Sequence, residues 1–145
     1  MLLEFKIINN KISFIMILIE KELKKELKNK YDFYNQKFFN NELCFVFFNF
    51  GGTFPGQMAN ALYHKESDRA QINIDSNILK YELQDIEQLW NTLLHEMIHI
   101  FLEKRDITQS NVHGEAFINK ANLIGKRMQL KSISTIEEAS KWPIK

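Results

Sequence analysis

Residues 90–102 read WNTLLHEMIHIFL, an almost wholly apolar run that carries the spacing His-Glu-x-x-His at His95, Glu96 and His99. Residues four apart lie on one face of an α-helix, so the two imidazoles would point toward a common position. Two neutral imidazole nitrogens at about 2.0–2.1 Å suit a zinc ion, and the glutamate beside the first histidine can reach a nearby water molecule as a general base. The spacing therefore predicts two metal ligands and a general base.

The apolar residues around this motif predict a buried helix. They fall on nearly every side of a helix: Leu89, Trp90, Leu93, Leu94, Met97, Ile98, Ile100, Phe101 and Leu102. Such a pattern is typical of a helix inside a core. Two histidines and a glutamate in such a place need partners, which a metal ion would supply. The alternative is a pair of hydrogen-bonded core histidines beside an unrelated glutamate, but the residue types and their spacing favour the metal.

The composition of the chain is that of one globular domain. Its 145 residues are 45% hydrophobic and 12% aromatic, so we expect a single domain over residues 1–145. The formal net charge of +1 gives no general attraction to nucleic acid or to a membrane. The apolar run Ile12–Ile19 is far shorter than the ~20 residues of a membrane span, and no cleavage site follows it. Because Cys44 is the only cysteine, the sequence contains no disulfide framework, and we expect a cytoplasmic protein.

A helical pattern occupies the first part of the chain. Apolar residues recur at three-four spacing from about Ser13 to Phe38, with lysines mostly between them. The lysines are better explained as a solvated helix face than as a polyanion site, because glutamates dilute them. Asn40 and Asn41 are expected to end this helix. For Leu3–Ile8 the sequence leaves a short strand and an irregular arm open.

Three short runs predict strands. They are Cys44–Phe50, Met58–Tyr63 and Arg69–Ile74, which are separated by a Gly-Gly and Pro-Gly segment and by a polar turn. We expect them to form a small antiparallel sheet of three strands, so that the fold class is α+β.

Helices are predicted for most of the remaining chain. Ile78–Leu83 suggests a short helix, and Asp85 would cap or open the motif helix, which should extend to Lys104. A further helix is expected from about Val112 to Met128. The tail from Leu130 to Lys145 would pack on the surface or fray.

A catalytic zinc site usually takes three protein ligands, so a third is needed. Leu102 and Arg105 occupy the positions of glycine and histidine in the longer motif His-Glu-x-x-His-x-x-Gly-x-x-His, which excludes that arrangement. His113, at the start of the next helix and followed by a glycine that would let the backbone approach the metal, is one candidate. Glu115 is the rival, and His64 is a weaker competitor in a polar hairpin.

Three segments together resemble the SprT-like metallopeptidase domain, to which the Spartan DNA–protein crosslink proteases belong. They are Tyr34-Asn35-x-x-Phe38-Phe39-Asn40-Asn41-Glu42-Leu43, Leu93-Leu94-His95-Glu96-Met97-Ile98-His99 and His113-Gly114-x-x-Phe117. The resemblance covers about Lys21–Met128. It implies a zincin-like helical core beside a small antiparallel sheet, a zinc cofactor and the His113 side chain as third ligand.

The expected function is that of a zinc-dependent endopeptidase with Glu96 as its catalytic base and a protein or peptide as its substrate. The resemblance suggests DNA-bound or DNA-crosslinked proteins as substrates, with DNA as a further partner, although this sequence lacks the cysteines of the zinc ribbon that many members carry. Lys120, Lys126, Arg127 and Lys131 form either a modest basic patch or the solvated face of a helix. The alternative function is a non-catalytic, zinc-containing binding module for a peptide or nucleic acid, and the intact glutamate speaks against it.

Supporting residues are less constrained by the sequence. Tyr63 or His64 would be the donor to the oxyanion of the reaction, and Asp106 or Asn91 would orient a ligand imidazole. The oligomeric state is left open.

Overall fold

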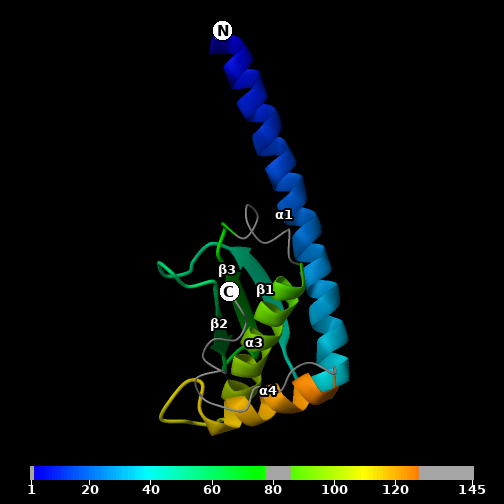
Figure 1. Cartoon of the computed structure of the whole chain (residues 1–145), viewed down its shortest axis with the longest axis vertical. Coiled ribbons are helices and arrows are strands. Elements are labelled where there is room, and N and C mark those ends of the chain that lie inside the picture. The colour runs from blue at the N-terminus through cyan, green and yellow to red at the C-terminus, as the bar shows by residue number, and fades with distance from the viewer. Residues whose placement is uncertain (1, 78–85, 128–145) are drawn as a thin grey trace.

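The computed structural model describes residues 2–77 and 86–127, and it has the predicted α+β class (Figure 1). The elements are α1 (Leu2–Phe39), β1 (Phe45–Phe50), β2 (Ala59–His64), β3 (Arg69–Ile74), α3 (Ile86–Lys104) and α4 (Glu115–Arg127). The predicted helix Ile78–Leu83, the cap at Asp85 and the tail Leu130–Lys145 lie outside the described residues.

Helix α1 begins at Leu2, so both structures considered for Leu3–Ile8 are wrong. The first glycine of the chain is Gly51 and the first proline is Pro55, so no strong helix breaker interrupts the segment before them. The polar residues near its beginning weaken the helical pattern without stopping the helix. In Figure 1 the first turns of α1 extend past the sheet and the other helices.

The end of α1 is fixed by asparagines, as predicted. Asn40 and Asn41 have φ angles of 52° and 60°, the left-handed conformation that asparagine tolerates better than most residues. The Asn41 amide donates to the carbonyl of Asn35 at 3.0 Å, which closes the last turn. The Asn35 side chain then bonds both backbone groups of Leu43, at 3.1 and 3.3 Å. These contacts direct the chain from the helix into β1.

The sheet is mixed, not antiparallel as predicted. Its strand order is β1-β3-β2. The outer strand β1 pairs with β3 in parallel, with Phe45 opposite Arg69, whereas β2 pairs with β3 antiparallel, with His64 opposite Arg69. The alternation of apolar and polar residues predicts which face of a strand is buried but not which strand lies beside it. The three predicted strand positions are confirmed within one residue at each end.

One face of the sheet is covered by helices. Helix α1 contacts β1, α3 contacts β2, and the two helices contact each other. Val46 and Ile72 point into this layer and are at most 2% exposed. Phe45 and Phe47 alternate with Val46 on β1, and both are about half exposed on the opposite face.

Helix α4 packs on α3 and is also tied to α1. The Lys120 ammonium donates to the backbone carbonyl of Phe38 at 2.8 Å and lies 4.4 Å from the centroid of the Phe101 ring. A cation is favourable at the C-terminal end of a helix, where carbonyl groups lack partners within the helix. Lys120 therefore has a structural role, which argues against its place in a basic patch.

No helix in the described part of the chain is both long and apolar enough to cross a membrane.

Candidate metal centre

Helix α3 carries the His-Glu-x-x-His motif through the core, as the sequence predicts. Leu94, Met97 and Ile98 are fully buried around it. His95 is 7% exposed and Glu96 is 5% exposed, so two polar side chains of the motif are also buried. Buried polar groups are destabilising unless they are satisfied, so the helix must place them where they have partners.

The chain reverses directly after α3. The amide of Ile107 donates to the carbonyl of Leu102 at 2.9 Å, and Asp106 between them has a positive φ of 55°. This turn sends the chain back along α3, so that the segment with His113 can reach His95 and His99. Helix α4 begins at Glu115, three residues later than the predicted start at Val112. His113 consequently stands in the loop before α4, not in its first turn.

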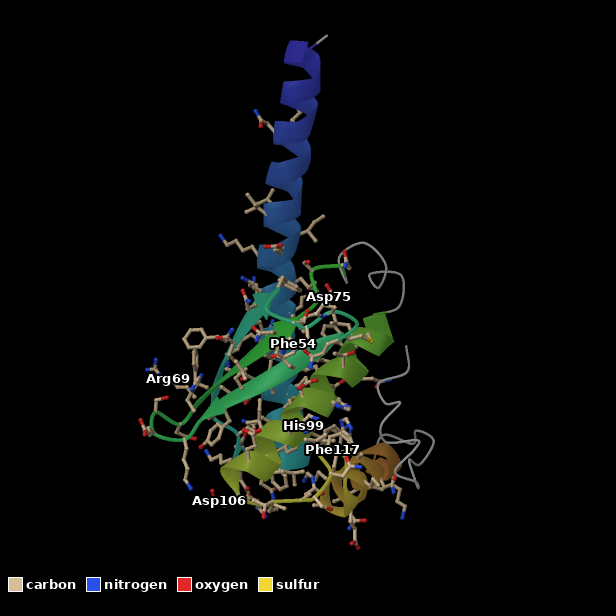
Figure 2. The ribbon with its side chains drawn as sticks, turned by 90° about the vertical axis from the view of Figure 1, so that its left-hand side faces the viewer. Phe54, Arg69, Asp75, His99, Asp106 and Phe117 are labelled. Carbon is tan, nitrogen blue, oxygen red and sulfur yellow. The ribbon has the colours of Figure 1, made fainter. Side chains whose placement is uncertain are left out.

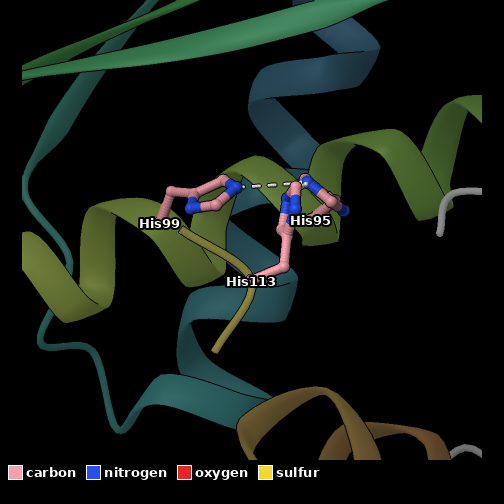
Figure 3. A group of neighbouring side chains, drawn as sticks. All are labelled: His95, His99 and His113. Atoms are coloured by element: carbon pink, nitrogen blue, oxygen red, sulfur yellow. Dashed lines mark hydrogen bonds between the residues drawn. The ribbon is translucent and has the colours of Figure 1, made fainter. Parts of the chain in front are cut away.

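Three imidazoles meet where this loop passes α3 (Figure 3). The Nε2 atom of His95 lies 3.1 Å from Nε2 of His99 and 3.0 Å from Nε2 of His113. One nitrogen from each of the three histidines falls within 4.8 Å of the others. These residues form the group of potential ligands found in the described part of the chain, and they are the ones that the resemblance implies.

The arrangement suits a cation better than hydrogen bonds alone. A ring nitrogen carries either one hydrogen or one in-plane lone pair, so Nε2 of His95 cannot form good hydrogen bonds with both neighbours at once. Ligand nitrogens of a tetrahedral zinc site, at about 2.0–2.1 Å from the ion, are about 3.3 Å apart. The two shortest separations here are near that value, so the three histidines fit a shared metal ion.

Phe117 supports all three imidazoles. Its ring centroid lies 4.8 Å from those of His95 and His99 and 4.9 Å from that of His113. The side chain is fully buried. Figure 2 shows Phe117 beside His99, where α4 meets α3. The first turn of α4 thus places an apolar surface against the three imidazoles and restricts their movement.

Burial shifts the titration of the cluster. It raises the pKa of Glu96 from 4.5 to about 8. It also lowers the pKa of His99 from 6.5 to about 4, with a smaller contribution from the charge of His113, and it lowers the pKa of His113 itself. The imidazoles of His99 and His113 are therefore neutral near pH 7, which is the form that binds a metal.

The competing ligands do not join the cluster. Glu115 is the exposed first residue of α4, and His64 is exposed at the end of β2. Neither belongs to the group of potential metal ligands in the described residues.

The supporting roles that the sequence suggested for Tyr63, His64, Asp106 and Asn91 stay predictions. The Tyr63 hydroxyl donates to Asp68 at 2.7 Å. Asp106 accepts a hydrogen bond from Lys65 at 2.7 Å, at the C-terminal end of α3 (Figure 2). For Asn91, no hydrogen bond to an imidazole is found within the residues described.

One supporting residue was missed. Gln109, whose side-chain oxygen accepts a hydrogen bond from the amide of Ala116 at 3.0 Å, connects the loop that carries His113 to α4. Sequence patterns give no signal for it, because a single glutamine in a polar loop resembles any solvated residue.

Fold and site together define a candidate metal centre built on a buried helix and completed from the following loop. A model of the SprT-like family matches residues 27–138, most of the chain, so the chain belongs to the SprT-like family. Membership is consistent with a metallopeptidase. No curated protein matches the sequence significantly.

Proposed function

We propose that this chain is a zinc-dependent endopeptidase in which His95, His99 and His113 hold the metal and Glu96 is the catalytic base. The observation that carries the proposal is the convergence of three imidazole nitrogens, within 4.8 Å of one another, next to a buried glutamate. A site that holds zinc only for structure has four protein ligands and no use for a buried carboxylate. Family membership supports the same reaction class.

In this mechanism the three histidines hold the ion, and Glu96 transfers protons. When bound, zinc would act as a Lewis acid that acidifies a water molecule and polarises the scissile carbonyl. Glu96 accepts a proton from that water and later donates it to the leaving amine. Burial raises the pKa of Glu96, so its carboxylate is a stronger base for the first transfer. The charge of a bound zinc ion would favour the ionised form of this carboxylate.

The proposed substrate is a protein with an exposed or flexible segment, because peptide hydrolysis requires an accessible backbone. DNA-bound or DNA-crosslinked proteins are the narrower proposal, which follows from the resemblance to the Spartan proteases. The rival function is a binding module that holds zinc without hydrolysis.

Digestion of an unfolded protein such as casein tests the proposal. The zinc-loaded chain should cleave it, a chelator should stop cleavage, and added zinc should restore it. Glu96→Gln should retain zinc but lose activity by about 10²–10⁴-fold, the usual contribution of a general base. Glu103→Gln, an exposed glutamate on the same helix, is the matched control and should remain active. Undiminished cleavage by Glu96→Gln would contradict the mechanism, and zinc binding without cleavage in the unmodified chain would favour the binding module. Parallel digestions with single-stranded DNA test the narrower substrate.

A further inference from the structure

The side chain of Gln109 connects the loop that carries His113 to the start of α4. Its Oε1 atom accepts hydrogen bonds from the backbone amides of Ala116 at 3.0 Å and Phe117 at 3.4 Å. These amides belong to the first turn of α4, where N–H groups have no partner within the helix. Gln109 therefore caps α4 from the loop that precedes it. In the sequence, His113 lies between Gln109 and the two amides that it caps.

The orientation of this amide is determined by its surroundings. Because two N–H donors face the same side-chain atom, that atom must be the oxygen. The Nε2 group then faces the carbonyl of Val112 at 3.4 Å, a longer contact. Gln109 thus contacts the backbone on both sides of His113. Asn111 adds a local bond, since its Oδ1 accepts from the His113 amide at 3.1 Å.

Gly114 is the counterpart of Gln109. A Cβ atom at this position would lie 2.8 Å from Gln109 Oε1 and 3.0 Å from the carbonyl oxygen of Asn111. The first distance is too short for a contact, so the Gln109 side chain would have to leave the two amides that it bonds. The second is a tight contact with a backbone atom, which moves less easily. Gly114 is not among the residues with positive φ, so conformational freedom does not explain the glycine. The Gln109 side chain and the Asn111 carbonyl occupy the space that a Cβ would need, and this gives the His-Gly pair of the motif a specific physical reason.

We propose that Gln109 is the positioning residue of the third metal ligand and that Gly114 leaves the room that its side chain needs beside the Asn111 carbonyl. This inference rests on the proposed function, because it assigns Gln109 to the same metal centre. A loop held in the binding conformation before the metal arrives loses less conformational entropy on binding. Removing the hydrogen bonds of Gln109 should therefore weaken metal affinity even though this residue is not a metal ligand.

Zinc affinity, measured by competition with a chromophoric chelator, tests the proposal. Gln109→Met, which keeps the length but removes the acceptor, should weaken zinc binding about 10–100-fold, as for other residues that orient a ligand. Gln109→Glu keeps an acceptor at a helix N-terminus, where negative charge is favoured. Its zinc affinity should stay within about threefold of that of the unmodified chain. Ser110→Ala, an exposed neighbour in the same loop, should have no effect.

A second control separates positioning from general stability. Lys120→Met removes the bond from α4 to the carbonyl of Phe38 and lowers stability without touching the ligand loop. It should leave zinc affinity within about twofold, whereas Gln109→Met at a similar melting temperature should not. Equal affinity losses in both variants would reduce Gln109 to a helix cap and overturn the proposal.

A double-mutant cycle of Gly114 and Gln109 tests the role of the glycine. Gly114→Ala should weaken zinc binding more than tenfold in the unmodified chain but substantially less in the Gln109→Ala background, where the closest clash is absent. Equal effects in both backgrounds would overturn the pairing. If the unmodified chain binds no zinc, the proposed function itself fails. If it binds zinc and Gln109→Met binds it equally well, the positioning role alone fails.

Discussion

The Nε2 atoms of His95 and His113 lie 3.0 Å apart, although 18 positions separate the two residues in the sequence. Helix α3 supplies His95, and the reversal of the chain after Lys104 supplies His113. His99 completes the cluster from one turn further along α3, at 3.1 Å from His95. The centre therefore depends on the loop after α3 as much as on the helix itself.

This arrangement predicts which residues determine zinc content. His113→Ala should lower zinc affinity by at least 100-fold, because removal of one of three ligands leaves only the helical pair. Glu115→Ala should change it by less than twofold, since Glu115 is exposed and outside the cluster. Metal analysis after dialysis against a weak chelator measures both variants. The reverse pattern would assign the third ligand to the glutamate.

The buried carboxyl of Glu96 predicts a pH dependence for the metal-free protein. Its pKa is 4.5 in the unfolded chain and about 8 in the folded chain, so the folded state binds the proton more tightly between these values. This contribution is fully present below pH 4.5 and is lost as the pH rises through about 8. Chelator-treated protein should therefore become less stable relative to Glu96→Gln as the pH rises from about 5 to 8.

Urea unfolding of both metal-free proteins across this range provides the measurement. Because the glutamine side chain of the variant does not titrate, the difference between the two curves isolates Glu96 from the histidines. A constant difference between pH 5 and pH 8 would show that the carboxyl is not desolvated in the folded chain. Bound zinc should reduce the pH dependence, since a nearby positive charge favours the carboxylate.

Phe117 should matter for both stability and the metal. Phe117→Ala removes a fully buried ring that contacts all three imidazoles, and we expect a loss of about 3–5 kcal/mol in the free energy of unfolding. Phe117→Leu should lose less stability yet still weaken zinc binding, because a smaller side chain restricts the rings less. Leu123→Ala, at a half-exposed position on α4, is the control and should cost under about 1 kcal/mol. Zinc affinity unchanged in Phe117→Leu would contradict the supporting role.

The motif helix and the strand positions could be predicted because their patterns are local. Apolar residues on all sides of Leu89–Leu102 indicate burial, and alternation over Arg69–Ile74 indicates a strand. The parallel pairing of β1 with β3 could not be predicted, because it joins segments that are distant in the sequence and leaves no periodic signal. The helical conformation of Leu3–Ile8 could not be predicted from its apolar pattern, which is weak, although neither glycine nor proline interrupts the segment.

The residues of the candidate site also differ in whether local sequence patterns predict them. His95, Glu96 and His99 are recognisable from spacing alone, since helix geometry fixes their relation. The residues left His113 and Glu115 open as third ligand, and it was the resemblance to a family that favoured His113. Gln109 could not be found from either source, because its role depends on where the loop folds relative to α4.

The most direct measurement of the central claim is a crystal structure of the zinc-loaded chain with anomalous data collected at the zinc edge. We expect one strong peak about 2.0–2.1 Å from Nε2 of each of His95, His99 and His113. A peak bound to only two of these imidazoles, or coordinated by Glu96 or Glu115 in place of His113, would contradict the account.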